Sequence, residues 1–266
     1  MRSLKEKLPS TIVLYFLKLE MNSSLIGEKT FYKKDQLNFL KLSLDYNQAH
    51  RFKVKKNQFK SKRTIVHGVN ILLCAIEYFL NFTEKKIYNV NCSFFRPVFL
   101  NEKIKFYFYK DGKNNFIEIE NYKKEICVKV FLIFNNSNKI KSNIPQKVIN
   151  KIMRSKKIIN ANPMGFLNKK FKILLLKNKK FPIFPKITNI YGNVFCDAIC
   201  AASYFIGMKC PGEKAIFTNI KFDLDVIRKN LNYLLFDVYR YDNRIRLFSI
   251  KVAGLTKMSI QSILTK

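Results

Sequence analysis

Two apolar segments of helical length, one in each half of the chain, restrict the possible folds more than any other feature. The first covers residues 65–81 (IVHGVNILLCAIEYFLN) and the second covers residues 190–208 (IYGNVFCDAICAASYFIGM). Polar residues interrupt both segments too rarely for a surface helix, so both are predicted to be buried core helices. The apolar runs of the chain are too short or too interrupted to span a bilayer, and no membrane span is expected.

Strand-like segments follow each of these helices. They are rich in Val, Ile, Phe and Tyr and are separated by turn signals such as Arg96-Pro97, Asp111-Gly112 and Asp242-Asn243. A buried helix followed by antiparallel strands, present twice, predicts an α+β fold built by internal duplication, with one sheet wrapped around each helix. The predicted strands are residues 89–109 with a bend, 116–134 as one strand or a pair, 215–226, 231–241 and 245–252.

The duplication also predicts where the domains begin and end. We expect an N-terminal domain at residues 1–140 and a C-terminal domain at residues 163–266. Residues 141–162 between them are polar and basic, which is typical of a linker with at most one short helix.

The net charge of +32 suggests a nucleic-acid binder as one competing class. The basic residues are spread over both halves, asparagine is abundant and alanine is scarce, so a general compositional bias explains the charge better than a selected polyanion site. The aromatic residues also lie mainly in strand-like segments, and no nucleic-acid partner is expected. Six cysteines without CxxC pairs and the lack of a signal-peptide pattern predict a cytoplasmic protein.

The chain has two histidines, His50 and His67, and both lie near a segment with acid–base character. Residues 35–50 read DQLNFLKLSLDYNQAH, in which leucines at helical spacing predict a short helix over residues 34–44. Asp45 ends this helix and His50 follows across a turn, so both side chains are able to reach one pocket.

His67-Gly68 then opens the first apolar helix. The first N–H groups of a helix have no partner within the helix, and they can donate to an anionic oxygen with the aid of the helix dipole. A base, an acid and an oxyanion donor are what reversible addition of water to an α,β-unsaturated thioester requires.

Three stretches together resemble one family. FLKLSLDYNQAH resembles the hydratase-2 signature of MaoC-like dehydratases and (R)-specific enoyl-CoA hydratases, aromatic-x-x-Leu-Ser-Gly-Asp-x-Asn-Pro-x-His. TIVHGVNILLCAIEYF resembles the His-Gly opening of that family's central helix, and NCSFFRPVFLNEKIKF is similar to its next strand pair. These matches cover residues 26–134 in the family's order, whereas the second half resembles only the scaffold. The resemblance implies a double hot-dog fold in which two helix-wrapping sheets share one active site.

The resemblance also implies roles for individual residues. Asp45 and His50 match the catalytic pair that activates water and transfers the proton at the α-carbon. Gly68 matches the oxyanion donor. The substrate-binding residues implied in this way are Gly68, Asn47, His67 and Val69, and no metal ligand is implied.

The implied reaction is the reversible hydration of a 2-enoyl thioester to a 3-hydroxyacyl thioester, with an (R) product. No cofactor is expected, because coenzyme A or phosphopantetheine enters as part of the substrate. A homodimer is compatible with the resemblance. The basic residues 51–63 suit coenzyme A phosphates or an acyl carrier protein as partner, although the composition slightly favours ordinary solvated charge there.

The motif departs from the family pattern at Leu44, which replaces a glycine, and at Gln48, which replaces a proline. A positive φ at residue 44 would favour glycine, so leucine there puts the placement of Asp45 in question. The second half has Tyr191 where His67 is expected and no Asp–His pair, which predicts one active site per chain. A non-catalytic acyl-thioester-binding protein and a thioesterase are the alternatives, since a fold does not fix a function.

Overall fold

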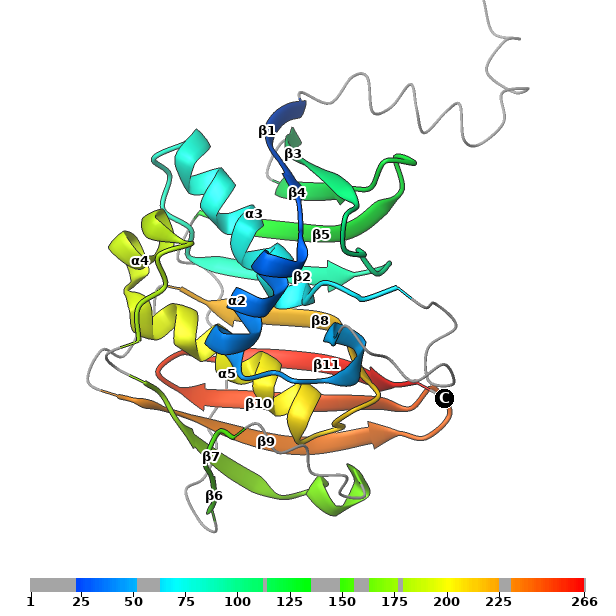
Figure 1. Ribbon diagram of the computed structural model, residues 1–266. Coiled ribbons are helices and arrows are strands. Elements are labelled where there is room, and N and C mark those ends of the chain that lie inside the picture. The colour runs from blue at the N-terminus through cyan, green and yellow to red at the C-terminus, as the bar shows by residue number, and fades with distance from the viewer. Residues whose placement is uncertain are drawn as a thin grey trace, which may run out of the picture.

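The computed structural model describes residues 23–51, 63–111, 114–134, 149–155, 163–176, 179–224 and 231–265. Within them, the strands form one sheet in the order β1-β3-β4-β5-β2-β8-β11-β10-β9-β7-β6 (Figure 1). The elements of the first half are β1 (Ser23–Thr30), α2 (Lys33–Ser43), the 3₁₀ turn η1 (Gln48–His50), α3 (Gly68–Phe82), β2 (Asn89–Phe94), β3 (Lys103–Asp111), β4 (Asn114–Glu120) and β5 (Ile126–Ile133). Those of the second half are β6 (Ile149–Ile152), η2 (Pro163–Phe166), β7 (Lys170–Leu174), α4 (Pro185–Tyr191), α5 (Asn193–Met208), β8 (Ala215–Asp223), β9 (Tyr233–Asp242), β10 (Leu247–Gly254) and β11 (Met258–Leu264).

The two halves join edge to edge through strands β2 and β8. These strands pair antiparallel, from Asn89 opposite Asp223 to Ser93 opposite Asn219. The expectation of two separate sheets is therefore corrected to one continuous sheet, in which only β6 and β7 pair parallel. The physical reason is that two unpaired strand edges would leave backbone N–H and C=O groups without partners, and pairing satisfies both edges at once.

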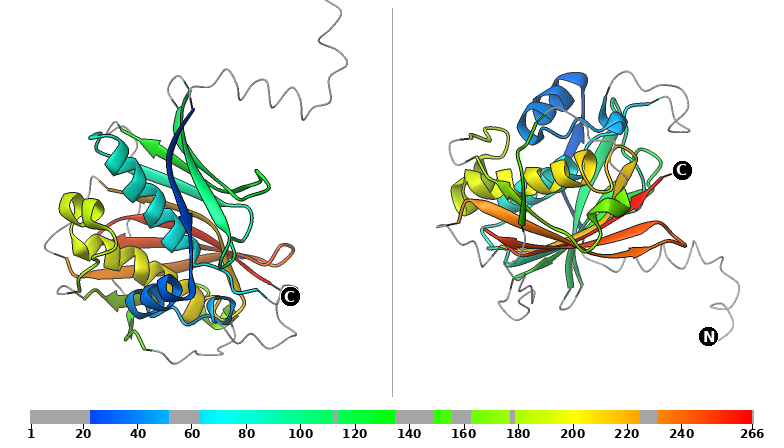
Figure 2. Two further views of the ribbon diagram at one scale, coloured as in Figure 1. Left: turned by 45° about the horizontal axis from the view of Figure 1, so that its top comes forward. Right: turned by 90° about the horizontal axis from the view of Figure 1, so that it is seen from below.

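Helices α3 and α5 lie side by side on the same face of this sheet (Figures 1 and 2). Helix α3 contacts β1 and β3, whereas α5 contacts β8 and β9. Every residue of α5 from Phe195 to Met208 is buried, and so is most of α3. The prediction of two buried core helices is confirmed, and their side chains belong to one hydrophobic core that spans both halves.

Both helices begin later than their apolar patterns suggest. Helix α3 begins at Gly68 because Ile65 is extended and forms a β-bridge with Phe99. The second apolar segment is divided at Gly192, whose φ of 86° ends α4 and lets α5 leave at an angle of 109°. No single helix in the described ranges is long and apolar enough to cross a membrane; α4 and α5 pass that test only as a bent pair.

The predicted strands match β2 to β5 and β8 to β10, and residues 116–134 are a strand pair. Strands β1, β6, β7 and β11 were not predicted from the sequence. Strand β6 lies inside residues 141–162, so this stretch contributes a strand where a linker with one short helix was expected. The remaining residues of that stretch, apart from residues 153–155, lie outside the described part of the chain.

Helix α2 confirms the short helix before Asp45. Leu37, the first of its leucines, is 40% exposed, whereas Phe39 and Leu40 are buried. The fully buried Gln36 sets this orientation, because its amide donates to the backbone oxygens of His50 at 3.1 Å and Ile65 at 3.0 Å. Helix α2 is thereby fixed directly to the segment that carries the predicted catalytic residues.

Candidate active site

The turn after helix α2 begins at Leu44, which adopts a left-handed conformation with φ 57°. Its N–H donates to the oxygen of Leu40 at 2.9 Å and closes the helix. The position therefore does require a positive φ, as the glycine of the family motif suggests, and leucine adopts it at a strain of about 1–2 kcal/mol. Its partly buried side chain packs against the core, which offsets part of that strain.

Despite this leucine, Asp45 points into a cavity and its carboxylate is held at both oxygens. The hydroxyl of Ser203 on helix α5 donates to Oδ2 at 2.7 Å, and the backbone N–H of Asn47 donates to Oδ1 at 3.2 Å. The side chain is almost fully buried. Hydrogen bonds of this kind favour the ionised form, and they oppose the rise in the pKa of Asp45 that burial causes.

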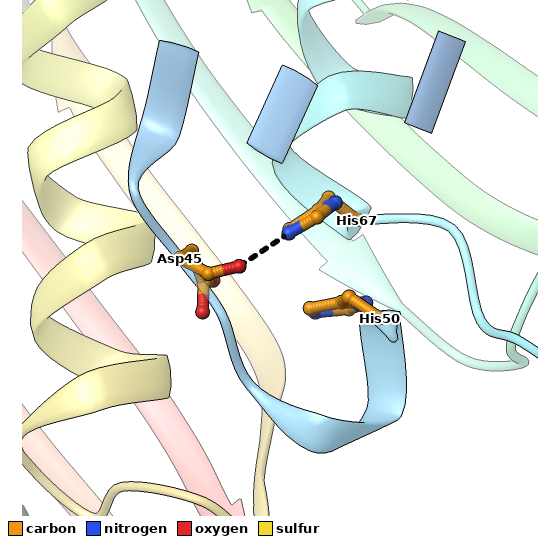
Figure 3. A group of neighbouring side chains, drawn as sticks. All are labelled: Asp45, His50 and His67. Carbon is orange, nitrogen blue, oxygen red and sulfur yellow. Dashed lines mark hydrogen bonds between the residues drawn. The ribbon is translucent and has the colours of Figure 1, made fainter. Parts of the chain in front are cut away.

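His50 follows on the 3₁₀ turn η1, close to Asp45 (Figure 3). Its Nδ1 lies 2.9 Å from the oxygen of Ile65, and because a carbonyl oxygen only accepts, Nδ1 carries the proton. The lone pair of the neutral ring is therefore on Nε2. One ligand-type atom from each of Asp45, His50 and His67 lies within 4.8 Å of the others.

His67 lies behind His50, and the two imidazole rings stack at a centroid distance of 3.7 Å (Figure 3). Nε2 of His67 donates to the backbone oxygen of Asp45 at 3.0 Å. The His67 ring therefore fixes both the backbone of Asp45 and the ring plane of His50. His67 is fully buried and does not line the cavity. Val69 is also buried outside the cavity wall, and the predicted part of these two residues in substrate binding stays a prediction.

Burial shifts the titration of all three groups toward their neutral forms. Burial raises the pKa of Asp45, while the nearby His50 and the hydrogen bonds from Ser203 and Asn47 act in the opposite direction. Burial lowers the pKa of His50, opposed by the Asp45 charge. Burial and the neighbouring His50 lower the pKa of His67 well below the ordinary imidazole value. At neutral pH, the His50 imidazole is consequently neutral and able to act as a base.

The spacing of Asp45, His50 and His67 would allow a metal ion, but their hydrogen bonds oppose one. A metal ligand needs a lone pair directed at the ion. Nε2 of His67 carries a proton toward the Asp45 backbone oxygen, and Nδ1 of the same ring is enclosed in the protein without a hydrogen-bond partner. Of these three residues, only His50 and Asp45 offer ligand atoms to the cavity, which is fewer than the three or four protein ligands of a zinc site.

The cavity has a volume of about 500 Å³ and is mostly apolar. Of the predicted site residues, Asp45, Asn47, His50 and Gly68 line it. Its other walls come from both halves of the chain: Ile71 and Phe94 belong to the first half, and Ile206, Gly207, Phe217 and Ile263 belong to the second. Polar groups are therefore gathered at one place in a pocket suited to an apolar chain.

Gly68 is the first residue of helix α3 and contributes backbone to the cavity wall. A Cβ at this position would lie 2.8 Å from the ring of Phe94, so glycine allows the aromatic ring to approach the helix end. The N–H of Asn70 in this first turn donates to the oxygen of His67 at 2.9 Å. The N–H groups of Gly68 and Val69 precede the first hydrogen bond of the helix and lie at the positive end of its dipole.

Asn47 stabilises the turn between the two predicted catalytic residues. Its Oδ1 accepts from the N–H of Ala49 at 3.0 Å and caps η1, while its Nδ2 lies 3.4 Å from the oxygens of Gly212 and Ala215. The turn is therefore ordered by hydrogen bonds, although Gln48 replaces the proline of the family motif.

Two site residues were not found from the sequence. Ser203 bonds Asp45, and Gly207 lies against the same carboxylate and lines the cavity. Both are on α5, one turn apart on one face, far from Asp45 in sequence. Small residues in an otherwise apolar helix were the available signal, but such residues are more often explained by close packing.

The basic stretch at residues 51–63 is described only at its ends. Arg63 lies over the ring of Phe99, a cavity residue, at 4.3 Å, and 3.8 Å from the carboxylate of Glu102. The proposed phosphate-binding role of residues 52–62 falls outside the described part of the chain.

The second half does not repeat this site. Helix α5 is preceded by Gly192 as its N-cap, where α3 has His67, so the expected match of Tyr191 to His67 is displaced by one residue. The Tyr191 hydroxyl instead donates to the oxygen of Ile87 at 2.9 Å and accepts from its N–H at 3.0 Å. With both histidines in the first half, one Asp–His pair per chain follows.

No protein-family model matches the sequence, and no curated protein matches it. Solved structures do match. One described as "MaoC-like dehydratase" aligns with a TM-score of 0.54 at 7% identity, over 92% of this chain and 98% of that one. A putative MaoC domain protein dehydratase from Chloroflexus aurantiacus aligns with a TM-score of 0.54 at 8% identity, over 92% and 95% of the two chains. The peroxisomal multifunctional enzyme type 2 of Drosophila melanogaster aligns with a TM-score of 0.53 at 7% identity, over 95% of this chain and 51% of that one.

Proposed function

We propose that this chain, which has the fold of MaoC-like dehydratases, hydrates a 2-enoyl thioester or dehydrates a 3-hydroxyacyl thioester. The scaffold is a double hot-dog, and Asp45 and His50 are the catalytic pair. One observation carries the proposal: the Asp45 carboxylate and the His50 imidazole meet at the wall of a mostly apolar cavity, next to the N-terminus of helix α3.

In the hydration direction, Asp45 and His50 hold one water molecule between them. Nε2 of His50 accepts one proton of the water while its oxygen bonds to C3 of the enoyl group, and the Asp45 carboxylate accepts a hydrogen bond from the other proton. The electron pair of the C2=C3 bond moves to the thioester carbonyl and forms an enolate. When the enolate collapses, C2 takes the proton from His50, so atoms and charge balance and the pair returns to its starting state.

The enolate oxygen requires a donor, and we assign this role to the N–H of Gly68. It belongs to the first turn of α3 and borders the cavity, where the helix dipole also favours negative charge. The low polarity of the surrounding walls strengthens this interaction, because few mobile dipoles compete with it.

The substrate class follows from the cavity. Its apolar walls suit an acyl chain, and the thioester carrier, coenzyme A or the phosphopantetheine of an acyl carrier protein, arrives as part of the substrate. The proposal needs no separate cofactor or metal. The (R) configuration of the product, a cytoplasmic location and a homodimer are carried over from the family resemblance and the sequence as proposals.

Purified protein mixed with crotonyl-CoA and longer trans-2-enoyl-CoAs tests this function through the loss of enoyl absorbance. We expect Asp45→Asn and His50→Ala each to lower kcat/KM by about 10²–10⁴-fold. Asp242→Asn is a matched control, since Asp242 is paired with Arg244 at the end of β9, away from the cavity. Activity that survives in both site variants would overturn the assigned mechanism.

The product distinguishes the competing functions. A thioesterase would release a free thiol and the carboxylic acid, whereas a non-catalytic binder would retain the enoyl thioester unchanged. Repeating the assay with an enoyl-acyl carrier protein covers the second carrier, and absence of turnover with both carriers would favour the binder.

A further inference from the structure

We propose that Ser203 and Gly207 on helix α5 are positioning residues for the Asp45 carboxylate, so that the half of the chain without a catalytic pair completes the active site of the other half. The inference deepens the proposed function and rests on it for its kinetic consequences. The contact itself can be tested without any activity.

Ser203 is engaged in an unusual way for a serine inside a helix. Such a hydroxyl commonly donates back to the carbonyl one turn earlier in its own helix. Here the buried Ser203 hydroxyl donates across the molecule to Oδ2 of Asp45 at 2.7 Å. Because a serine hydroxyl has one proton, this bond uses its whole donor capacity. Together with the Asn47 N–H on Oδ1, it fixes the rotation of the carboxylate about its Cβ–Cγ bond.

Gly207 provides the space that the carboxylate occupies. A Cβ built on Gly207 would lie 2.1 Å from Oδ1 of Asp45, 2.7 Å from Cγ and 2.8 Å from Oδ2. No other residue fits this position unless the carboxylate moves. A glycine inside a helix is less favourable than alanine, so its presence in α5 has a packing reason, and that reason is the Asp45 side chain.

The residues on both sides of Asp45 are also attached to the second half. The Lys179 ammonium donates to the backbone oxygen of Leu42, near the end of helix α2. The N–H of Tyr46 contacts Sδ of Met208 at 3.1 Å. The position of the carboxylate relative to His50 is therefore set by α5 and the residues around it, and not only by the turn that connects the pair.

A double-mutant cycle on thermal unfolding tests the contact directly. We expect Gly207→Ala to lower the unfolding midpoint by several degrees when Asp45 is present, and to leave it unchanged or raise it in the Asp45→Ala background, where the opposing oxygen is gone. Gly165→Ala is the matched control, because a Cβ there would meet no atom within 4 Å. If the single variant Gly207→Ala does not fold, folding of the double variant Asp45→Ala/Gly207→Ala would support the contact in the same way. An equal shift in both backgrounds would overturn the inference.

Kinetics test the positioning role. Ser203→Ala is expected to lower kcat about tenfold or more with little change in KM, and Ser203→Thr, which keeps the hydroxyl, should recover part of the loss. Ser249→Ala is the control, because Ser249 is a buried serine on β10. Equal effects of Ser203→Ala and Ser249→Ala would contradict the role.

The pH profile separates positioning from general stability. Loss of the Ser203 hydrogen bond raises the pKa of Asp45, so the acid limb of kcat/KM should move to higher pH. Among the described residues, the other titratable groups near this carboxylate are His50, Cys200 on α5, and His67, which bonds the backbone oxygen of Asp45. Ser203→Ala changes none of them. An unmoved limb would contradict the inference. Should the wild type not hydrate thioesters at all, the proposed function fails, while the unfolding cycle still decides the contact.

Discussion

Helices α3 and α5 occupy corresponding places in the two halves, yet they contribute to the site with opposite ends. Helix α3 brings its N-terminus, with Gly68 at the cavity and His67 against His50 and the Asp45 backbone. Helix α5 brings the region near its C-terminus, with Ser203 and Gly207 against Asp45. The half of the chain without an Asp–His pair therefore still contributes to the site, because its helix α5 holds the Asp45 carboxylate in place.

The residues that precede the two helices, His67 and Tyr191, also differ in what they contact. His67 stacks on His50 and bonds the backbone of Asp45. Tyr191 bonds the backbone of Ile87, and burial raises its pKa to about 12, so its phenol stays neutral. His67 therefore supports the side chain of His50, which we propose transfers protons, whereas Tyr191 supports the backbone before β2.

We expect the largest difference in activity between variants of His50 and of Tyr191. His50→Ala removes the base and should lower kcat/KM by about 10²–10⁴-fold while the protein remains folded. Tyr191→Phe should leave kcat within about twofold and lower the free energy of unfolding by about 1–3 kcal/mol, because the N–H of Ile87 is left buried without a partner. Steady-state kinetics and urea unfolding of both variants check this, and a comparable kinetic loss in Tyr191→Phe would break the comparison.

A second effect concerns Gly68. In Gly68→Ala, the added Cβ would lie 2.8 Å from the ring of Phe94, which is closer than van der Waals contact. The end of α3 or the ring must therefore shift. We expect kcat/KM to fall by about 10–100-fold, somewhat less than the loss of a complete oxyanion donor. Gly165→Ala serves as control, and an unchanged kcat/KM would remove Gly68 from the mechanism.

A third effect is the dependence of stability on pH. The pKa of His67 is lowered in the folded state, so the unfolded chain binds a proton that the folded chain does not as the pH falls below about 6.5. The free energy of unfolding should therefore fall with the pH by up to about 1.4 kcal/mol per pH unit from this group. The raised pKa of Asp45 acts in the opposite direction.

His67→Gln isolates that contribution, because glutamine keeps an N–H donor for the Asp45 backbone oxygen without titrating. Urea unfolding of both proteins between pH 5 and 7.5 should show a shallower slope in the variant. Identical slopes would mean that the folded chain protonates His67 as readily as the unfolded chain.

The smallest expected effect is at Leu44. Leu44→Ala loses packing and keeps a side chain at a positive φ, whereas Leu44→Gly loses the same packing and gains conformational freedom. We expect the glycine variant to be more stable than the alanine variant by about 1 kcal/mol, with both retaining most of the activity. Thermal unfolding of the pair measures the difference, and a more stable alanine variant would contradict a strained turn.

Local patterns were enough to predict several parts of the molecule. The apolar segments predicted both core helices, and the alternation and turn residues predicted β2 to β5 and β8 to β10. The spacing of Asp45, His50 and Gly68 predicted groups that do line one cavity. In each case the information lies within a short stretch of sequence, in a periodicity or a motif.

The features that were missed depend on contacts between distant residues. Pairing of β2 with β8, which makes one sheet from two, leaves no mark on either strand alone. The burial of Gln36 on α2 was not predicted, because this polar residue is held inward by two backbone oxygens beyond the helix. Ser203 and Gly207 looked like ordinary small residues in a packed helix, and only the placement of Asp45 against them reveals their part in the site.

The central claim is that one active site, with its proton-transfer groups in the first half and its support in the second, adds water to an enoyl thioester. The most direct measurement is mass spectrometry of the product formed from a trans-2-enoyl-CoA in water enriched in oxygen-18. We expect a 3-hydroxyacyl-CoA that carries one heavy oxygen on the acyl chain, formed by the wild type and by Ser249→Ala. Its formation should be strongly reduced in Ser203→Ala and abolished in His50→Ala. Free coenzyme A with the heavy oxygen in a carboxylic acid, or unaltered hydration by His50→Ala, would contradict it.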